Sequence, residues 1–436
     1  MRIPVTRMET QIEDDQTLLT KWDEIQTKTN ALKEVTSQLS SFTTWNQKSA
    51  TSSDTSVMTA SATTSAVTGE YSIDITSLAT AEKYWGTTQS ESALGLSGSF
   101  TINGQVISVA TDYTLSDIAR SINSVSGDMT KKVSAYIVNN VMFLKNADTG
   151  VSNTMSITDT DGILGGTGGL GFDLSKATNY TAGTDLAGTV ENIAVSSASN
   201  TGITSFISGV TLNFTDDTTI LGPVKLTVEN DTDTIKSLLQ DFVDAYNDLN
   251  DYMSAVQSVT LNTAGTSVSS AGYLQGDLVA NTLENRVRSL TSASITKSGY
   301  INSDYSSLRQ IGIYVKSDTN KLAIGDSDAL DEALSNHFQD VQNMFRMTDP
   351  GTGEVVGVMK NLDSYLGNVL DPVQGPIYQR QTDLNADISD KQTRVYNLNM
   401  QLQGEETALY EHFAATESIT SFWTSQLSYL QKALGS

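Results

Sequence analysis

Residues 377–413 read IYQRQTDLNADISDKQTRVYNLNMQLQGEETALYEHF, and their apolar members recur at the spacing of a coiled-coil seam. The steps between these members are four, seven, three, four and seven residues. They are Leu384, Ile388, Val395, Leu398, Leu402 and Leu409. Nearly everything between them is polar, so the stripe is narrow and must pack against another helix to be buried.

The N-terminal segment supplies a second apolar stripe and is a candidate partner for the first. Its members follow at steps of four, three, seven and seven residues: Leu18, Trp22, Ile25, Leu32 and Leu39. Thr29 and Thr36 occupy seam positions and weaken this stripe. Phe413 and Trp423 continue the C-terminal contact surface. We expect the two chain ends to form a helical stem, in which each packs against a helix of the same chain or of a neighbouring one.

Composition excludes several classes of function. The 436 residues include 50 acidic and 26 basic side chains, for a formal net charge of −24. Such a surface repels phosphate backbones and anionic lipid headgroups, which disfavours nucleic-acid binding and membrane-surface binding. Cysteine is absent, which excludes disulfides, thiolate nucleophiles and Cys-ligated zinc. The 2 histidines leave little material for His-based catalysis or metal binding.

The sequence also predicts no membrane insertion, because no apolar run approaches about 18 residues. Residues 1–13 lack the basic-then-apolar layout of a cleaved signal peptide. We therefore expect any export of this chain to proceed without such a signal.

The order of helix and strand patterns predicts an α+β multidomain fold, in which a coiled-coil-like stem built from both chain ends carries two β-rich head domains. The predicted N-terminal part is 1–69, a stem helix followed by a Ser/Thr-rich linker or extended segment at 49–68. The predicted inner β-rich head is 70–97 with 180–233, and the outer α+β head is 98–179. The remainder, 234–436, is predicted to be a mostly helical stem with a small β-pair near 311–324.

Local signals within the outer head are specific. Asn103-Gly104 and Asn139-Asn140 lie between alternating apolar residues and predict two hairpin turns. Thr114, followed three residues later by Asp117, predicts the start of a short helix. These signals indicate a compact module of strands and one helix.

We predict no catalytic, cofactor or metal site. The GTGGLG stretch at 166–171 matches G-x-G-x-x-G, but no helical pattern follows it, which favours a loop over a dinucleotide site. Asp159 and Asp161 resemble half of a calcium loop whose remaining ligands are missing. His337 and His412 lie on helical patterns with no nucleophile motif nearby, which favours structural or surface roles.

The chain resembles the bacterial filament-capping family, also called flagellar hook-associated protein 2. The resemblance rests on many short segments in the family's order rather than on one motif. They are GEYSIDITSLATA at 69–81, GSFTING at 98–104, ISGVTL at 207–212, LTVEND at 226–231, FVDAYN at 242–247, LRQIGI at 308–313, FAATE at 413–417 and QLSYL at 426–430. The match departs at the start, where members carry a further polar stretch before Glu-x-x-Pro.

The resemblance implies a structural cap and no enzyme. It implies a homo-oligomeric ring of about five subunits at the distal end of the flagellar filament, with stem helices directed toward the filament and heads forming a plate. Exported flagellin would fold and insert beneath the plate, and the cap would prevent its leakage. The implied partners are further copies of the chain, flagellin, the hook-filament junction protein and an export chaperone. The implied location is the flagellum tip, extracellular or periplasmic, after export by the flagellar type III apparatus.

Two other hypotheses remain open at this point. The loop-rich heads, rich in Ser, Thr and Asn, are compatible with a surface-exposed adhesin that binds host or matrix glycans. An enzyme built on the acidic loops at Asp159 and Asp161 is the third hypothesis, and the scarcity of histidine and cysteine argues against it.

Overall fold

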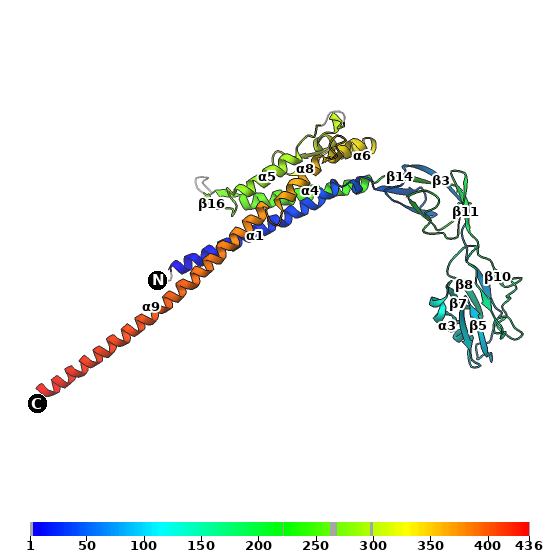
Figure 1. The fold of residues 1–436 in the computed structure, drawn as a ribbon, viewed down its shortest axis with the longest axis horizontal. Helices are drawn as coiled ribbons and strands as arrows, with labels where there is room; N and C mark the ends of the chain where they lie inside the picture. Colours follow the sequence, from blue (N-terminus) through cyan, green and yellow to red (C-terminus); the bar gives the residue numbers. More distant parts are fainter. Residues whose placement is uncertain (1–2, 221, 262–267, 297–299, 436) are drawn as a thin grey trace. The chain divides into compact units, whose positions relative to one another are not determined.

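The computed structural model describes residues 3–220, 222–261, 268–296 and 300–435, so Met1 and Arg2 of the predicted stem lie outside it. The chain forms two compact units. The helical unit comprises Met1–Trp45 with Thr232–Ser436, and the β-rich unit comprises Asn46–Asp231. Helices at both chain ends and β-rich domains between them confirm the predicted α+β class (Figure 1).

Long helices from both ends of the chain dominate the helical unit (Figure 1). Its helices are α1 (Ile3–Leu39), α2 (Phe42–Trp45), α4 (Thr232–Gln257), α5 (Leu278–Thr291), α6 (Ser327–Asn336), α7 (Phe338–Phe345), α8 (Val358–Val369) and α9 (Pro376–Leu434). Short antiparallel pairs connect them: β15 (Val259–Leu261) with β16 (Val268–Ala271), β17 (Ile313–Val315) with β18 (Leu322–Ile324), and β19 (Met347–Thr348) with β20 (Val355–Val356). The β17–β18 pair confirms the β-pair predicted near 311–324.

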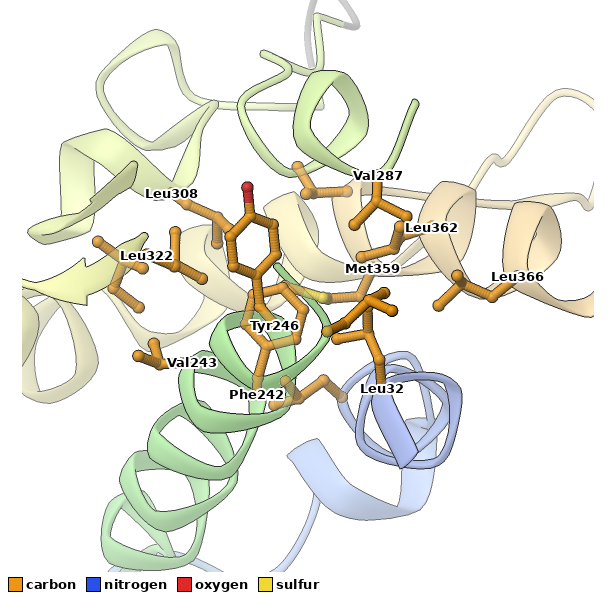
Figure 2. Close-up of a cluster of buried hydrophobic side chains, with 14 of the residues drawn as sticks. Leu32, Phe242, Val243, Tyr246, Val287, Leu308, Leu322, Met359, Leu362 and Leu366 are labelled. Carbon is orange, nitrogen blue, oxygen red and sulfur yellow. The ribbon is translucent and has the colours of Figure 1, made fainter. Parts of the chain in front are cut away.

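The core of the helical unit forms where α1 packs against α4 and α8. Figure 2 shows Leu32 of α1 facing Phe242 of α4 and Leu362 of α8, with Tyr246 of α4 directed toward the strands and loops above it. Burial raises the pKa of Tyr246 to about 12. The ring therefore contributes as a neutral apolar group at physiological pH.

A five-stranded antiparallel sheet forms the inner part of the β-rich unit, in the order β1-β14-β3-β11-β12. Its strands are β1 (Lys48–Ser52), β14 (Val224–Asn230), β3 (Gly69–Ser77), β11 (Leu186–Val190) and β12 (Ile193–Ser197). A second pair, β2 (Met58–Ala62) with β13 (Val210–Phe214), contributes Met58, Leu212 and Phe214 to the same core.

Of the two alternatives predicted for 49–68, the structure shows an extended segment and not a linker. This segment contains β1 and β2, which pair with β14 and β13 respectively. Its small Ser, Thr and Ala side chains give little apolar alternation, so the strand pattern is weak in the sequence. Pairing with strands more than 140 positions away supplies the backbone hydrogen bonds that make it a strand, as Lys48 opposite Asn230 illustrates.

Two small sheets and a helix make up the outer part of the β-rich unit. One sheet has the order β10-β4-β8-β7 and the other β6-β5-β9. The elements are β4 (Lys83–Trp85), β5 (Gly98–Ile102), β6 (Gln105–Val109), α3 (Leu115–Val125), β7 (Val133–Val138), β8 (Val141–Asn146), β9 (Ile157–Thr158) and β10 (Tyr180–Thr181). Helix α3 lies beside β7 (Figure 1), and its buried face, including Ile118 and Ile122, closes the core.

The predicted turns and helix start in this part are confirmed. Asn103-Gly104 and Asn139-Asn140 form two-residue hairpin loops with positive φ at both positions, as type I′ turns require. Thr114 is the N-cap of α3, and its side chain and that of Asp117 form a capping box. The local chemistry at these positions therefore agrees with the tertiary fold.

Replacing Thr114 with alanine removes the N-cap acceptor of α3 and should lower the free energy of unfolding of the β-rich unit by about 1 kcal/mol. Scanning calorimetry of the full chain measures the shift of its transition. Ser116→Ala is the matched control, because Ser116 lies exposed two positions later and makes no cap bond. Equal effects of the two substitutions would contradict the capping role.

Candidate functional site: the seam of the terminal helices

Helices α1 and α9 run antiparallel along the predicted seam (Figure 1). Gln381 Nε2 of α9 donates to Asp23 Oδ1 of α1 at 2.8 Å, and Lys391 Nζ, ten residues further along α9, donates to Asp15 Oδ2 of α1. Positions closer to the C-terminus of α9 thus lie opposite positions closer to the N-terminus of α1. The structure therefore brings the two chain ends together as one seam.

The stripe predicted on α1 lies inside the helical core. Trp22, Ile25, Leu32 and Leu39 are fully buried, and Leu18 is half-buried at the edge of the same cluster. Sequence spacing alone did not reveal that α4 and α8 contribute to burying this stripe alongside α9. The signal for α4 was present as an apolar stripe in residues 235–249, but no spacing rule connects it to α1.

The stripe predicted on α9 divides into three parts. Leu384 and Ile388 are buried, as is Ile377, which the seam prediction did not include. Val395, Leu398 and Leu402 are half-buried. The remaining three predicted residues are exposed by more than half: Leu409, Phe413 and Trp423.

The antiparallel register explains this gradient. Matching Lys391 to Asp15 places Ile3, the first described residue of α1, opposite about residue 403 of α9. Every residue from 403 to 435 is exposed, and we call this part of α9 the free segment. Within the described residues, no other helix packs on it.

The free segment keeps alternating steps of four and three residues, although no helix of the described residues covers it. From Leu409 to Leu434 these steps pass through Phe413, Thr416, Thr420, Trp423, Leu427 and Leu430. The prediction did not include three exposed members of this stripe: Leu427, Leu430 and Leu434. Continuing the heptad of Leu402 reaches Leu409, Trp423 and Leu430, whereas Leu427 and Leu434 each lie four residues beyond such a position.

Ion pairs flank the seam at two levels. Lys391 Nζ lies between Asp15 and Asp387, and hydrogen bonds to Asp15 first and Asp387 second raise its pKa. Lys28 Nζ of α1 lies 2.8 Å from Asp248 Oδ2 of α4. This hydrogen bond raises the pKa of Lys28, although burial opposes the shift. Because these side chains remain partly exposed, each pair adds little stability and mainly favours the observed register.

The acidic loop of the outer head has a structural role. The Asp159 carboxylate accepts the backbone N–H groups of Ile163, Leu164 and Gly165, each at 2.8 Å, and Asp161 accepts that of Ser99 at 2.7 Å. Asp159 thus satisfies the partly buried donors of Ile163 and Leu164, and both carboxylates fix the backbone of the loop. Across the part of the chain that the structure describes, no cluster of His, Asp or Glu has the arrangement of a metal site.

Among the described glutamates and aspartates, Glu82 is the one that is fully buried. Tyr180 donates to its Oε1 at 2.9 Å and Lys176 at 3.1 Å, while the N–H of Met155 donates to its Oε2. All of these partners are internal to the β-rich unit. This network ties β4 to the loops around it and leaves no open position for a substrate.

Comparison with known proteins identifies the fold's relatives. A sequence model of the C-terminal region of flagellar hook-associated protein 2 matches residues 183–424, more than half of the chain, and one of its N-terminal region matches residues 1–82. The chain belongs to the flagellar hook-associated protein 2 family. The resemblance inferred from short segments is therefore confirmed.

Relatives align with the chain over most of its length. The A-type flagellar hook-associated protein 2 of Pseudomonas aeruginosa is 26% identical over 93% of this chain and 86% of its own length. The flagellar hook-associated protein 2 of Escherichia coli K12 is 29% identical over 88% of this chain and 83% of its own. A crystal structure of the D1-D2-D3 domains of the Escherichia coli flagellar cap protein FliD is similar over 84% of this chain and 99% of that chain, with a TM-score of 0.57 and 25% identity.

Among the helices of the described residues, none is both long and apolar enough to cross a membrane. Polar residues, including Glu411 and Glu417, separate the apolar side chains of the free segment. A narrow apolar stripe of this kind fits contact with another helix better than contact with lipid.

Replacing Thr29 with valine should stabilise the helical unit by about 1 kcal/mol. The Thr29 hydroxyl is fully buried and has no hydrogen-bond partner, so it carries a desolvation cost that the isosteric valine removes. Chemical denaturation followed by circular dichroism measures the change. Thr36→Val is the control, because the Thr36 hydroxyl donates to the Leu32 carbonyl at 2.6 Å and its loss brings no such gain. A smaller gain at Thr29 than at Thr36 would contradict this account.

Aspartate at Leu384 should destabilise the helical unit by about 3 kcal/mol or more, because a carboxylate would be buried without a partner. Leu398→Asp should have a smaller effect in the same direction, since Leu398 is only half-buried. Leu409→Asp, at an exposed position of the same stripe, should change stability by less than about 0.5 kcal/mol. Equal destabilisation at Leu384 and Leu409 in urea titrations would show that the free segment is covered in the isolated chain.

Proposed function

We propose that this chain is the structural cap at the distal end of the flagellar filament. The free segment of α9 is the observation that supports the proposal most directly. This segment presents apolar side chains at seam spacing, and no described helix of the chain packs on it. A stable helix of this kind is suited to receiving helices from other subunits.

Family membership indicates which subunits these are. Relatives are named flagellar hook-associated proteins, and solved neighbours are named flagellar cap proteins. We infer that the exposed seam residues of α9, Leu409, Phe413 and Trp423, contact helices of filament subunits and of neighbouring caps. The buried α1 residues, including Trp22 and Leu32, hold α9 in place for those contacts. The cap would be a homo-oligomeric ring of about five copies.

The finer parts of the proposal concern what the cap does. Flagellin that reaches the tip would fold and insert beneath the cap, and the closed ring would prevent its leakage into the medium. The hook-filament junction protein and an export chaperone are the further partners, and export would use the flagellar type III apparatus without a cleaved signal peptide. The head boundaries at 70–97, 98–179 and 180–233 divide the plate-forming part from the stem. The adhesin alternative finds no support in the names of the relatives.

Replacing Phe413 with aspartate should abolish capping while leaving the chain folded. The Phe413 side chain is 66% exposed, so its loss costs no internal packing, but a charge in the stripe would oppose docking of a partner helix. The test is complementation of a strain that lacks its own cap gene, with motility and flagellin in the culture medium as readouts. We expect the variant to lose motility and release flagellin.

Ser418→Asp is the matched control, because Ser418 is equally exposed but lies on the opposite side of α9 from the stripe. It should complement like the unmodified chain. If the unmodified chain fails to reduce flagellin release, the capping role is wrong. If Phe413→Asp complements fully, the capping role stands but the free segment is not its contact surface.

A further inference from the structure

One face of the outer sheet is not covered by the rest of the β-rich unit. Strands β10, β4, β8 and β7 turn Tyr84, Leu144 and Ala135 toward the core beneath α3. The opposite side chains form three rows in register across the strands, and we call this surface the aromatic face. The rows are Thr181, Lys83, Lys145 and Ser134; then Trp85, Phe143 and Tyr136; then Val141 and Val138.

The three aromatic rings stack against one another across neighbouring strands. The centroids of Tyr136 and Phe143 are 5.2 Å apart with ring planes 8° from parallel, and those of Trp85 and Phe143 are 6.2 Å apart at 28°. Both faces of the Phe143 ring are therefore occupied. Sugars and nucleobases bind aromatic side chains through free ring faces, so this arrangement disfavours them. The ring edges, which carry partial positive charge, are left for a partner.

Two lysines give the aromatic face a positive charge. Lys83 and Lys145 lie directly opposite each other on paired strands, and like charges in this position oppose each other. The Nζ of Lys83 lies 5.7 Å from the centroid of Trp85 and 6.0 Å from that of Phe143. Neither ammonium forms an ion pair within the described residues, and no row contains a carboxylate.

We propose that the aromatic face binds a carboxylate-rich surface of a second copy of this chain. Carboxylates complement both the lysines and the ring edges, and a chain with 50 acidic and 26 basic residues carries them in excess. The exposed Val138 and Tyr136 add apolar area to the contact. This inference rests on the proposed homo-oligomeric cap and names the surface through which its copies meet.

Charge also determines the symmetry of the contact. If two aromatic faces met each other, the contact would hold the Lys83 and Lys145 side chains of both copies and no carboxylate to complement them. The aromatic face must therefore meet a different surface of its neighbour. Repeating such a head-to-tail contact around an axis closes a ring, which is the assembly proposed for the cap.

The test is sedimentation velocity of the full chain over a concentration series at low and high salt. The double variant Lys83→Glu/Lys145→Glu should weaken self-association by about tenfold or more, and Tyr136→Ala by a similar factor. Association of the unmodified chain should also weaken as salt is raised. The single variant Lys145→Glu should associate more weakly yet melt at the same or a higher temperature, because its new carboxylate lies opposite Lys83.

Lys316→Glu is the charge control and Val106→Ser the apolar control, since both side chains are exposed and lie off the aromatic face. Both should associate like the unmodified chain. Unchanged association of Lys83→Glu/Lys145→Glu and Tyr136→Ala, with the unmodified chain associating, overturns the aromatic face and leaves the proposed cap intact. An unmodified chain that is monomeric at every concentration overturns self-association altogether, whereas flagellin release in the complementation test reports on capping separately.

Discussion

Burial of the apolar stripe of α1 is the constraint on which the helical unit depends. This helix contacts α4, α8 and α9, so its side chains from Trp22 to Leu39 are shared by three neighbours. Each fully buried leucine or isoleucine in this stripe contributes about 1.5–3 kcal/mol by removal from water. Because the partners come from residues 232–434, the stripe also joins the two ends of the chain into one folded unit.

The antiparallel register that follows from this packing divides α9 into two functional parts. The part up to Leu402 is held by α1, with Lys391 and Gln381 marking the register. The free segment beyond it has the same sequence period but no described neighbour. One continuous helix thus extends from a packed core to an exposed apolar surface. On α1, the fully buried Thr29 hydroxyl interrupts the apolar packing and limits the stability of the helical unit.

Local chemistry predicted much of the β-rich unit, and non-local pairing explains the rest. The turn at Asn103-Gly104 and the cap at Thr114 were predictable because the responsible residues lie within four positions of one another. The strands within 49–68 were not, because their partners β13 and β14 lie more than 140 positions away. The aromatic face was also hidden, since Trp85 and Tyr136 come to flank Phe143 only through the strand order of the sheet.

The sequence by itself determined the α+β class, the helical chain ends and the family, because periodicity and ordered short segments are properties of the chain alone. It also determined which positions carry apolar side chains on α9. Only the tertiary structure decided which of them are covered. Leu384 and Leu409 satisfy the same spacing rule, yet one is 6% exposed and the other 53%. The difference arises because burial depends on where the partner helix lies, and seam spacing does not specify the extent of the partner.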